Sequence, residues 1–340
     1  MEIVTNKLQK PAYSESCLVD PFGREMNYLR LAITNRCNLR CLYCMPAEGI
    51  PLNSRDFILQ FEEMEKLIQI FQNLGVNKLR ITGGEPFVRK GLLEFLKRVN
   101  KFEKINLINL TTNAVFIGNI ISDLEGLKIG SLNISLDSLK KDRFFKVTRR
   151  DDFDILIKNI DKAIKSKISI KLNMVVLAGI NDDEIISFTR LVKDKPIEVR
   201  FIEQMPFSGG PASERIMSAD QILDILRQQY PLLYEQSLPN STARIFHNPG
   251  YKGTIGIIAG YSRTFCSSCT RLRVTPEGIL KTCLYDRGAV NLKEMLRSGK
   301  TDLQIKNAII LAVQNRAKDG FESQERYNRN SNLSMAQIGG

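Results

Sequence analysis

The chain has 340 residues, of which 43% are hydrophobic and 25% charged. This composition is ordinary for a soluble globular protein, and the length allows one large α/β domain or a barrel with an extension. The sequence has no run of about 18 apolar residues and no basic-then-apolar N-terminal pattern, so it predicts neither a membrane span nor a signal peptide. We therefore expect a cytoplasmic protein without a membrane partner.

The formal net charge is +12. Such a charge would attract an anionic partner, for example a nucleotide or RNA. A solvated basic surface explains the same charge equally well, and the charge alone does not separate the two interpretations.

Six strand candidates alternate with amphipathic helical patterns through the first two thirds of the chain. They are short, β-branched and apolar segments, as expected for strands covered on both faces; they lie at 29–34, 78–83, 106–113, 131–137, 168–176 and 197–205. Apolar residues at helical spacing predict helices over 61–74, 152–166 and 183–194. The alternation predicts parallel βαβ units.

Six units are too few for a closed barrel of eight strands, so we expect an α/β fold with an incomplete (βα)6 TIM-like barrel. The carboxyl ends of the strands would line its mouth. Three cysteines follow the first strand, "GGEP" ends the second and "TTN" ends the third, while Ser135 and Asp137 end the fourth. The sequence thus places its chemically active residues at the mouth.

The character of the sequence changes after residue 206, where "PFSGGPASER" interrupts the alternation. We expect a barrel domain over 1–206, with residues 1–26 as an N-terminal tail, and a C-terminal α+β extension over 207–340 that closes the mouth. The extension should contain a helix near 219–229 and a hairpin that turns at 276–278. Its end, from residue 332, has the composition of a flexible tail.

The first cysteine group is "CNLRCLYC", with Cys37, Cys41 and Cys44. In a cytosolic protein, clustered cysteines favour metal ligands over disulfides. A structural zinc ion takes four protein ligands and a disulfide takes two, whereas three thiolates suit an iron–sulfur cube with one open corner. The alternatives are a structural zinc site and unrelated cysteines.

The C-x3-C-x2-C spacing, with "GGEP" on the next strand, resembles the two signatures of the radical S-adenosylmethionine enzymes. The resemblance implies that the three cysteines hold a 4Fe–4S cluster whose open iron binds S-adenosylmethionine, and that electron transfer releases a 5′-deoxyadenosyl radical. It also implies that S-adenosylmethionine contacts Tyr43, Gly84, Ser135 and Met205. Gly84 has no Cβ, which would let the backbone approach the ligand.

The second group, "FCSSCTRLRVTPEGILKTC", contains Cys266, Cys269 and Cys283. With the "TRLR" that follows the pair, it is similar to the C-terminal site of the GTP 3′,8-cyclase family. The resemblance covers nearly the whole chain and implies a second 4Fe–4S cluster whose open iron binds the purine of GTP. The alternative is a zinc site completed by Cys17 or His247, although we interpret His247 as a surface or loop residue and Cys17 as an ordinary buried or tail thiol. Spacing does not decide between iron and zinc.

Arg271 and Arg273 alternate along a predicted strand, so both should point to one side, where guanidinium groups suit a triphosphate. The backbone of Leu272 lies between them. Further cations stand in the interiors of predicted strands, where a bound anion would supply a partner. The resemblance implies GTP contacts at Arg30, Arg80, Thr111 and Lys171, and a tail, Gly339–Gly340, that reaches the active site. Ala114 departs from the family, which usually has glycine after "TTN".

The resemblance implies a lyase that converts GTP to (8S)-3′,8-cyclo-7,8-dihydroguanosine 5′-triphosphate, the first step of molybdenum cofactor biosynthesis. It further implies a low-potential electron donor of the flavodoxin or ferredoxin type and a downstream cyclic pyranopterin monophosphate synthase. We expect a monomer or a homodimer that binds no nucleic acid.

Two alternatives remain open at this stage. One is a radical S-adenosylmethionine enzyme with an auxiliary cluster that acts on a peptide or RNA. The other is a zinc-stabilised basic protein that binds nucleic acid without catalysis, although the sequence shows no aromatic-rich strand suited to base stacking.

Overall fold

The computed structural model describes residues 17–50, 55–205, 216–238, 241–326 and 335–338. The strands are β1 (Tyr28–Ala32), β2 (Lys78–Thr82), β3 (Leu107–Thr112), β4 (Ile129–Ser135), β5 (Ser169–Val176), β6 (Glu198–Glu203), β7 (Tyr234–Gln236), β8 (Arg244–His247), β9 (Thr254–Ile258), β10 (Arg271–Val274), β11 (Ile279–Lys281) and β12 (Val290–Asn291). The helices are α1 (Phe61–Asn73), α2 (Leu92–Val99), α3 (Ile121–Glu125), α4 (Lys141–Thr148), α5 (Phe153–Ile164), α6 (Ile185–Asp194), α7 (Ala219–Gln229), α8 (Leu292–Arg297), α9 (Asp302–Gln314), α10 (Gly320–Arg326) and α11 (Met335–Ile338).

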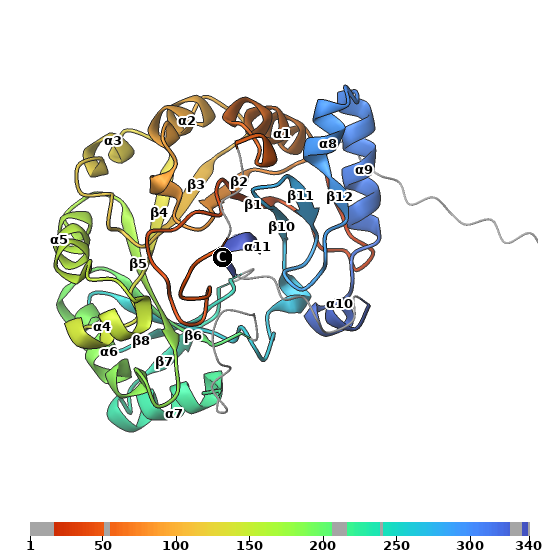
Figure 1. Ribbon diagram of the computed structural model, residues 1–340. Helices are drawn as coiled ribbons and strands as arrows, with labels where there is room; N and C mark the ends of the chain where they lie inside the picture. The colour runs from red at the N-terminus through yellow and green to blue at the C-terminus, as the bar shows by residue number, and fades with distance from the viewer. Residues whose placement is uncertain (1–16, 51–54, 206–215, 239–240, 327–334, 339–340) are drawn as a thin grey trace, which may run out of the picture.

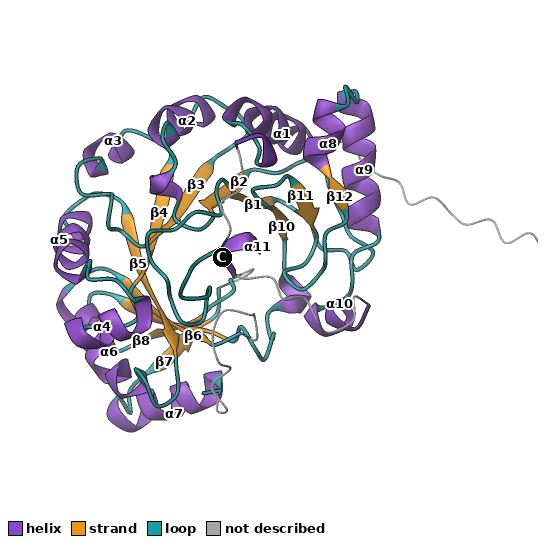
Figure 2. Ribbon diagram, viewed as in Figure 1, coloured by secondary structure: helices purple, strands orange, loops and turns teal. Residues whose placement is uncertain are grey.

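All strands belong to one sheet, in the order β12-β11-β10-β1-β2-β3-β4-β5-β6-β9-β8-β7. The run from β10 to β9 is parallel throughout. The sheet curves around a central space with α1 to α6 on its outside (Figures 1 and 2). β12 and β7 end the order without pairing to each other, so the predicted incomplete barrel is confirmed.

The six predicted strands and three predicted helices are present, with ends that differ by about two residues. The predicted helix at 219–229 and the hairpin of β10 and β11 are also present. The C-terminal segment does more than cover the mouth, because its strands extend the barrel sheet. β9 pairs with β6, and β10 pairs with β1, both in parallel. The sheet therefore has two more parallel strands than the sequence indicated.

Alternation along the strands separates an apolar outer face from a polar inner face. In β1, Leu29 and Leu31 are fully buried under the surrounding helices, and Arg30 between them points to the inside. Helix α1 buries Met64 and Leu67 on its inner side. The apolar core therefore fills the layer between sheet and helices and leaves the barrel interior polar.

Both chain ends differ from the expected tails where the structure describes them. Residues 17–26 form a turn closed by a bridge between Val19 and Glu25, and Leu18 and Met26 are buried. At the other end, Met335–Ile338 form α11 in the centre of the ring, and Ile338 is 2% exposed (Figure 1). The predicted tail residues 1–16, Gly339 and Gly340 lie outside the described residues.

The loop with the first cysteines packs directly on "GGEP". Gly84 donates a backbone hydrogen bond to the Thr34 carbonyl at 2.7 Å, and Glu85 donates one to the Arg36 carbonyl at 2.8 Å. A Cβ on Gly84 would lie 2.3 Å from the Arg36 carbonyl oxygen. We expected a glycine here because it leaves room for a ligand. The structure adds a second reason, because the backbone of the cysteine loop already occupies the space that a Cβ would need.

We expect Gly84→Ala to lower the free energy of unfolding by about 1–3 kcal/mol, since backbone atoms must move to admit the methyl group. Urea unfolding monitored by circular dichroism measures this change. Gly126→Ala is the matched control, because a Cβ there would meet its nearest neighbour at 3.7 Å. Equal stability of the two variants would contradict the packing argument.

Candidate functional site

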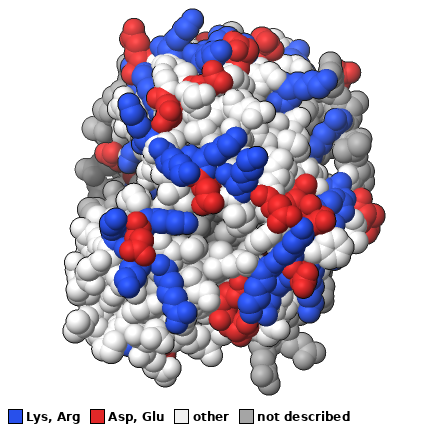
Figure 3. Space-filling view, turned by 90° about the vertical axis from the view of Figure 1, so that its left-hand side faces the viewer, with Lys and Arg blue, Asp and Glu red and all other residues white. Residues whose placement is uncertain are grey.

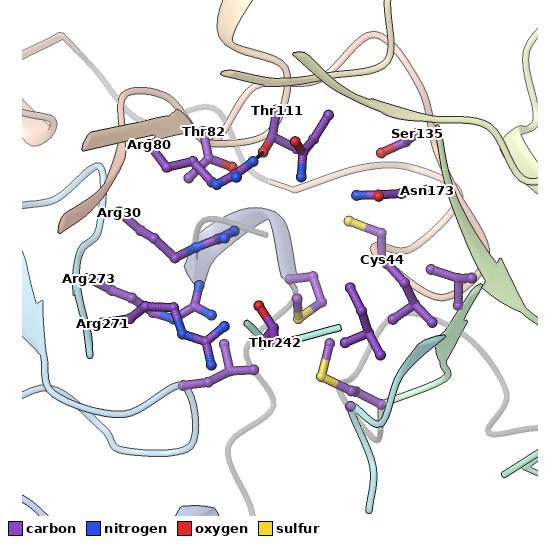
Figure 4. Close-up of a pocket in the computed structure, with 18 of the residues that line it drawn as sticks. Arg30, Cys44, Arg80, Thr82, Thr111, Ser135, Asn173, Thr242, Arg271 and Arg273 are labelled. Atoms are coloured by element: carbon purple, nitrogen blue, oxygen red, sulfur yellow. Dashed lines mark hydrogen bonds between the residues drawn. The ribbon is translucent and has the colours of Figure 1, made fainter. Parts of the chain in front are cut away.

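One cavity inside the ring is lined by both cysteine groups. Cys37, Cys41 and Cys44 come from the loop after β1, whereas Cys266 and Cys269 precede β10 and Cys283 follows β11. Figure 4 shows the cavity with arginines on one side and Cys44, Ser135 and Asn173 on another. The fold thus brings the two groups, which are far apart in the sequence, to one enclosed space.

The cysteines are not arranged around a single ion. Within the part of the chain that the structure describes, no three His, Cys, Asp or Glu side chains converge so as to hold one metal. A zinc ion with three thiolates would bring the sulfur atoms close together, at about 2.3 Å from the metal, whereas a four-iron cube places each thiolate on a different iron.

His247 does not take part in this site. It ends β8, where its Nε2 lies 2.7 Å from Gln236 Oε1 and its ring stacks on Tyr234. His247 lies on a strand and not in a loop, because the strand pairing with β7 extends to this residue, and its contact with Gln236 is exposed. His247 is a strand residue with local partners and does not line the cavity.

The first cysteine group lies among acidic and apolar neighbours. Burial, together with the nearby Glu85 carboxylate, raises the pKa of Cys37 to about 12. Burial and Asp137 likewise raise the pKa of Cys41. Asn113 Nδ2 approaches Cys37 Sγ at 3.9 Å. Thiolates at this place would need positive charge from a metal, which fits an iron–sulfur cluster.

Glu85 explains why "GGEP" and "TTN" meet at this edge of the sheet. Its carboxylate accepts hydrogen bonds from Asn113 N at 2.6 Å, Thr112 Oγ1 at 2.8 Å and Phe87 N at 3.1 Å. Burial raises its pKa to about 7, although these hydrogen bonds act in the opposite direction. The side chain therefore joins the ends of β2 and β3 beneath the cysteine loop.

The four residues predicted to contact S-adenosylmethionine all line the cavity: Tyr43, Gly84, Ser135 and Met205. The Tyr43 hydroxyl donates to Asp137 Oδ2 at 2.8 Å, which fixes the ring next to the cysteines. Asp137 also accepts from Val175 N at 3.0 Å. Burial raises the pKa of Asp137 to about 6.

Three arginines stand side by side on neighbouring strands. Arg30 of β1 is paired in register with Arg273 of β10 and with Arg80 of β2. All three line the cavity, together with Arg271, as predicted from the alternation (Figure 4). Arg80 donates hydrogen bonds to two neutral groups, Tyr28 Oη at 2.7 Å and Thr111 Oγ1 at 3.1 Å.

The charges in this row are buried and lie close to one another. Arg30 Nε is buried and has no hydrogen-bond partner among the described residues. Burial, followed by the charges of Arg273 and Arg80, lowers the pKa of Arg30. Burial and the adjacent Arg271 lower the pKa of Arg273 to about 10. A bound anion would satisfy this row.

Two of the residues predicted to contact GTP, Lys171 and Leu272, do not line the cavity. The Nζ of Lys171 pairs with Glu198 Oε2 of β6 at 2.9 Å, so a side chain of the protein supplies the negative partner that we had expected a bound anion to supply. The Leu272 side chain is fully buried and does not line the cavity. Thr111 lines it.

Ala114 adopts a left-handed backbone conformation with φ of +61°. Glycine tolerates this region better than alanine does. Alanine in place of the family's usual glycine therefore strains the backbone at this position. The turn is held by Thr112 Oγ1, which accepts from Ala114 N at 2.9 Å, and by Asn159, which donates to the Ala114 carbonyl at 2.8 Å.

Several cavity residues were missed by the sequence analysis. Asn173 lies two residues after Lys171 on the same strand, and its polar character among apolar neighbours was a usable signal. Thr242 precedes β8, and Arg24 and Arg316 lie near the chain ends. These three have no motif or periodicity that could have indicated them.

Two family descriptions match the chain. The radical SAM superfamily matches residues 31–192, and the family described as Molybdenum Cofactor Synthesis C matches residues 197–321. They cover the two segments that carry the first and the second cysteine group.

Among similar proteins, the GTP 3′,8-cyclase of Moorella thermoacetica is 39% identical over 94% of this chain and 99% of its own length. Molybdenum cofactor biosynthesis protein 1 of Dictyostelium discoideum is 42% identical over 87% of this chain and 48% of its own. The human protein of that name is 38% identical over 87% of this chain and 47% of its own. The chain thus spans about half the length of these longer relatives.

A similar solved structure is that of Streptococcus suis SuiB bound to S-adenosylmethionine. Its TM-score is 0.61 at 16% identity, over 80% of this chain and 64% of that one, which supports the fold alone. Identity to the Moorella protein over almost the full length of both chains supports more than the fold. The chain belongs to the GTP 3′,8-cyclase family of radical SAM proteins.

Proposed function

We propose that this protein is a GTP 3′,8-cyclase, a lyase that converts GTP to (8S)-3′,8-cyclo-7,8-dihydroguanosine 5′-triphosphate for molybdenum cofactor biosynthesis. One observation carries the proposal: two cysteine triads and a row of arginines line the same cavity. Anaerobic incubation with GTP, S-adenosylmethionine and a reductant, followed by mass analysis of the product, tests it. If S-adenosylmethionine is cleaved to 5′-deoxyadenosine while GTP is recovered unchanged, GTP is not the substrate.

Membership of the family implies a 4Fe–4S cluster and S-adenosylmethionine. Cys37, Cys41 and Cys44 would hold this cluster, and Tyr43, Gly84, Ser135 and Met205 would contact S-adenosylmethionine. When bound, these cofactors supply hydrogen-atom abstraction from an unactivated carbon, chemistry that belongs to the cofactors and not to the protein. The protein's part is to hold the reacting groups near one another and to keep water out.

The second triad, Cys266, Cys269 and Cys283, would hold a second 4Fe–4S cluster that binds the purine. The arginine row would bind the triphosphate through charged, forked hydrogen bonds. The GTP contacts then comprise Arg30, Arg80, Thr111, Arg271, the Leu272 backbone and Arg273. Lys171 would contact GTP only if GTP displaced Glu198 from its ion pair with Lys171. The roles of Gly339 and Gly340 stay predictions.

The partners also stay predictions: a flavodoxin- or ferredoxin-type electron donor, a downstream cyclic pyranopterin monophosphate synthase, and a monomeric or homodimeric state. No helix in the described ranges is both long and apolar enough to cross a bilayer. The cytoplasmic location stays a prediction of the sequence.

The nucleic-acid-binding alternative has less support. On the face shown in Figure 3, Lys and Arg side chains alternate with Asp and Glu and form no continuous basic stripe. Arg30, Arg80, Arg271 and Arg273 line the cavity inside the ring. This distribution suits a small anionic substrate better than a polyanion on the surface.

We expect Cys37→Ser to abolish reductive cleavage of S-adenosylmethionine and to remove about four irons per chain, because the first cluster loses a ligand. Liquid chromatography of 5′-deoxyadenosine and an iron assay measure both effects. Cys17→Ser, outside both groups, should behave as the unmodified protein. Cleavage retained by Cys37→Ser would rule out the first cluster assignment.

We expect the double change Arg271→Ala with Arg273→Ala to raise the dissociation constant for GTP about 100-fold, since two charged hydrogen bonds are lost. Calorimetric titration measures the binding, and cleavage of S-adenosylmethionine without GTP should persist. The exposed pair Arg190→Ala with Arg227→Ala serves as the control. GTP affinity equal to that of the control would disprove the triphosphate assignment.

A further inference from the structure

The turn at residues 17–26 lies against the second cysteine group and contains a buried ion pair. Asp20 and Arg24 are 4% and 8% exposed. Arg24 Nε donates to Asp20 Oδ2 at 2.6 Å, and Arg24 N donates to Asp20 Oδ1 at 2.9 Å. This turn therefore places a charged pair at the edge of the cavity, where the sequence indicated only a tail.

Arg24 connects the cysteine pair to the segment after α9. Its Nη1 donates to the Cys266 carbonyl at 2.8 Å and to the Lys318 carbonyl at 2.7 Å, and its Nη2 donates to the Ala317 carbonyl at 3.1 Å. One guanidinium thus fixes the backbone of the first cysteine of the pair relative to the end of that segment.

Arg316 reaches the second cysteine of the pair. It is 4% exposed, and its Nη2 donates to Cys269 Sγ at 3.1 Å. Its Nη1 contacts Met26 Sδ and lies 3.9 Å from Asp20 Oδ2. Arg271 Nε adds a longer contact to the same sulfur at 3.4 Å. Cys269 is therefore surrounded by positive charge.

The charges near Asp20 do not balance within the protein. One carboxylate serves two buried guanidiniums, those of Arg24 and Arg316. A buried cation without a full counter-charge is costly. A thiolate-bound cluster at Cys269 carries negative charge next to Arg316 and would complete the balance. An ordinary structural ion pair would need no sulfur acceptor.

We propose that Arg316, held by Asp20, is a positioning residue for the second cluster: its charged hydrogen bond to Cys269 retains the cluster and raises its reduction potential. This inference rests on the proposed function, which places a cluster at the second triad. Hydrogen bonds to ligand sulfur stabilise the more negative, reduced state, and partners that orient a metal ligand affect metal retention.

The test uses the full chain with Cys37, Cys41 and Cys44 all changed to Ser, so that only the second triad binds iron. In this parent, Arg316→Met removes every donor at similar length. We expect iron release to a chelator to be about 10-fold faster or more. We also expect a more negative reduction potential in a titration followed by electron paramagnetic resonance. Arg316→Lys keeps the charge and should lie between Arg316→Met and the parent.

Arg326→Met is the matched control, since Arg326 is an exposed arginine whose ionic partner is Glu322. Its release rate and potential should equal those of the parent. Equal values for parent and Arg316→Met, with both folded by circular dichroism, overturn the inference. If Arg316→Met does not fold, the comparison is made with Arg316→Lys. An iron-release rate and a reduction potential equal to those of the parent would then overturn the inference. A parent that binds no iron overturns the second cluster itself, and with it that part of the proposed function.

Discussion

Buried positive charge inside the barrel is the constraint on which this site depends. Arg273, Arg30 and Arg80 stand in register on three adjacent parallel strands and face the interior. Like charges at this spacing repel, and burial removes the water that would screen them. Such a row is tolerable when an anion occupies the space between the arginines. The strand register therefore concentrates positive charge on one wall of the cavity.

Cys269 of the second cysteine group has a different electrostatic setting from Cys37 and Cys41 of the first. The first lies beside Glu85 and Asp137, and burial together with these carboxylates raises the pKa of Cys37 and of Cys41. At the second, burial would raise the pKa of Cys269, but the charges of Arg271 and Arg316 outweigh it and lower the pKa to about 6. If both triads hold clusters as proposed, these surroundings would give the two clusters different potentials.

The C-terminal segment creates the shared cavity by joining the sheet at both of its parallel edges. β10 extends it beside β1, and β9 extends it beside β6. Hydrogen-bonded strands fix the second triad relative to the first more firmly than a loosely packed cap would. Glu203 strengthens this connection, because its buried carboxylate accepts from Ala219 N, Tyr261 N and the backbone and hydroxyl of Ser262.

The sequence by itself determined the alternating strands and helices, the two cysteine triads and the shared side of Arg271 and Arg273, because these follow from periodicity and short-range spacing. Only the tertiary structure decided which strands are neighbours. It thereby revealed the arginine row, the Glu198 partner of Lys171, the backbone contact that requires Gly84, and the turn that brings Asp20 to the second triad. These contacts join residues far apart in the chain, and local patterns carry no information about which distant segments pair.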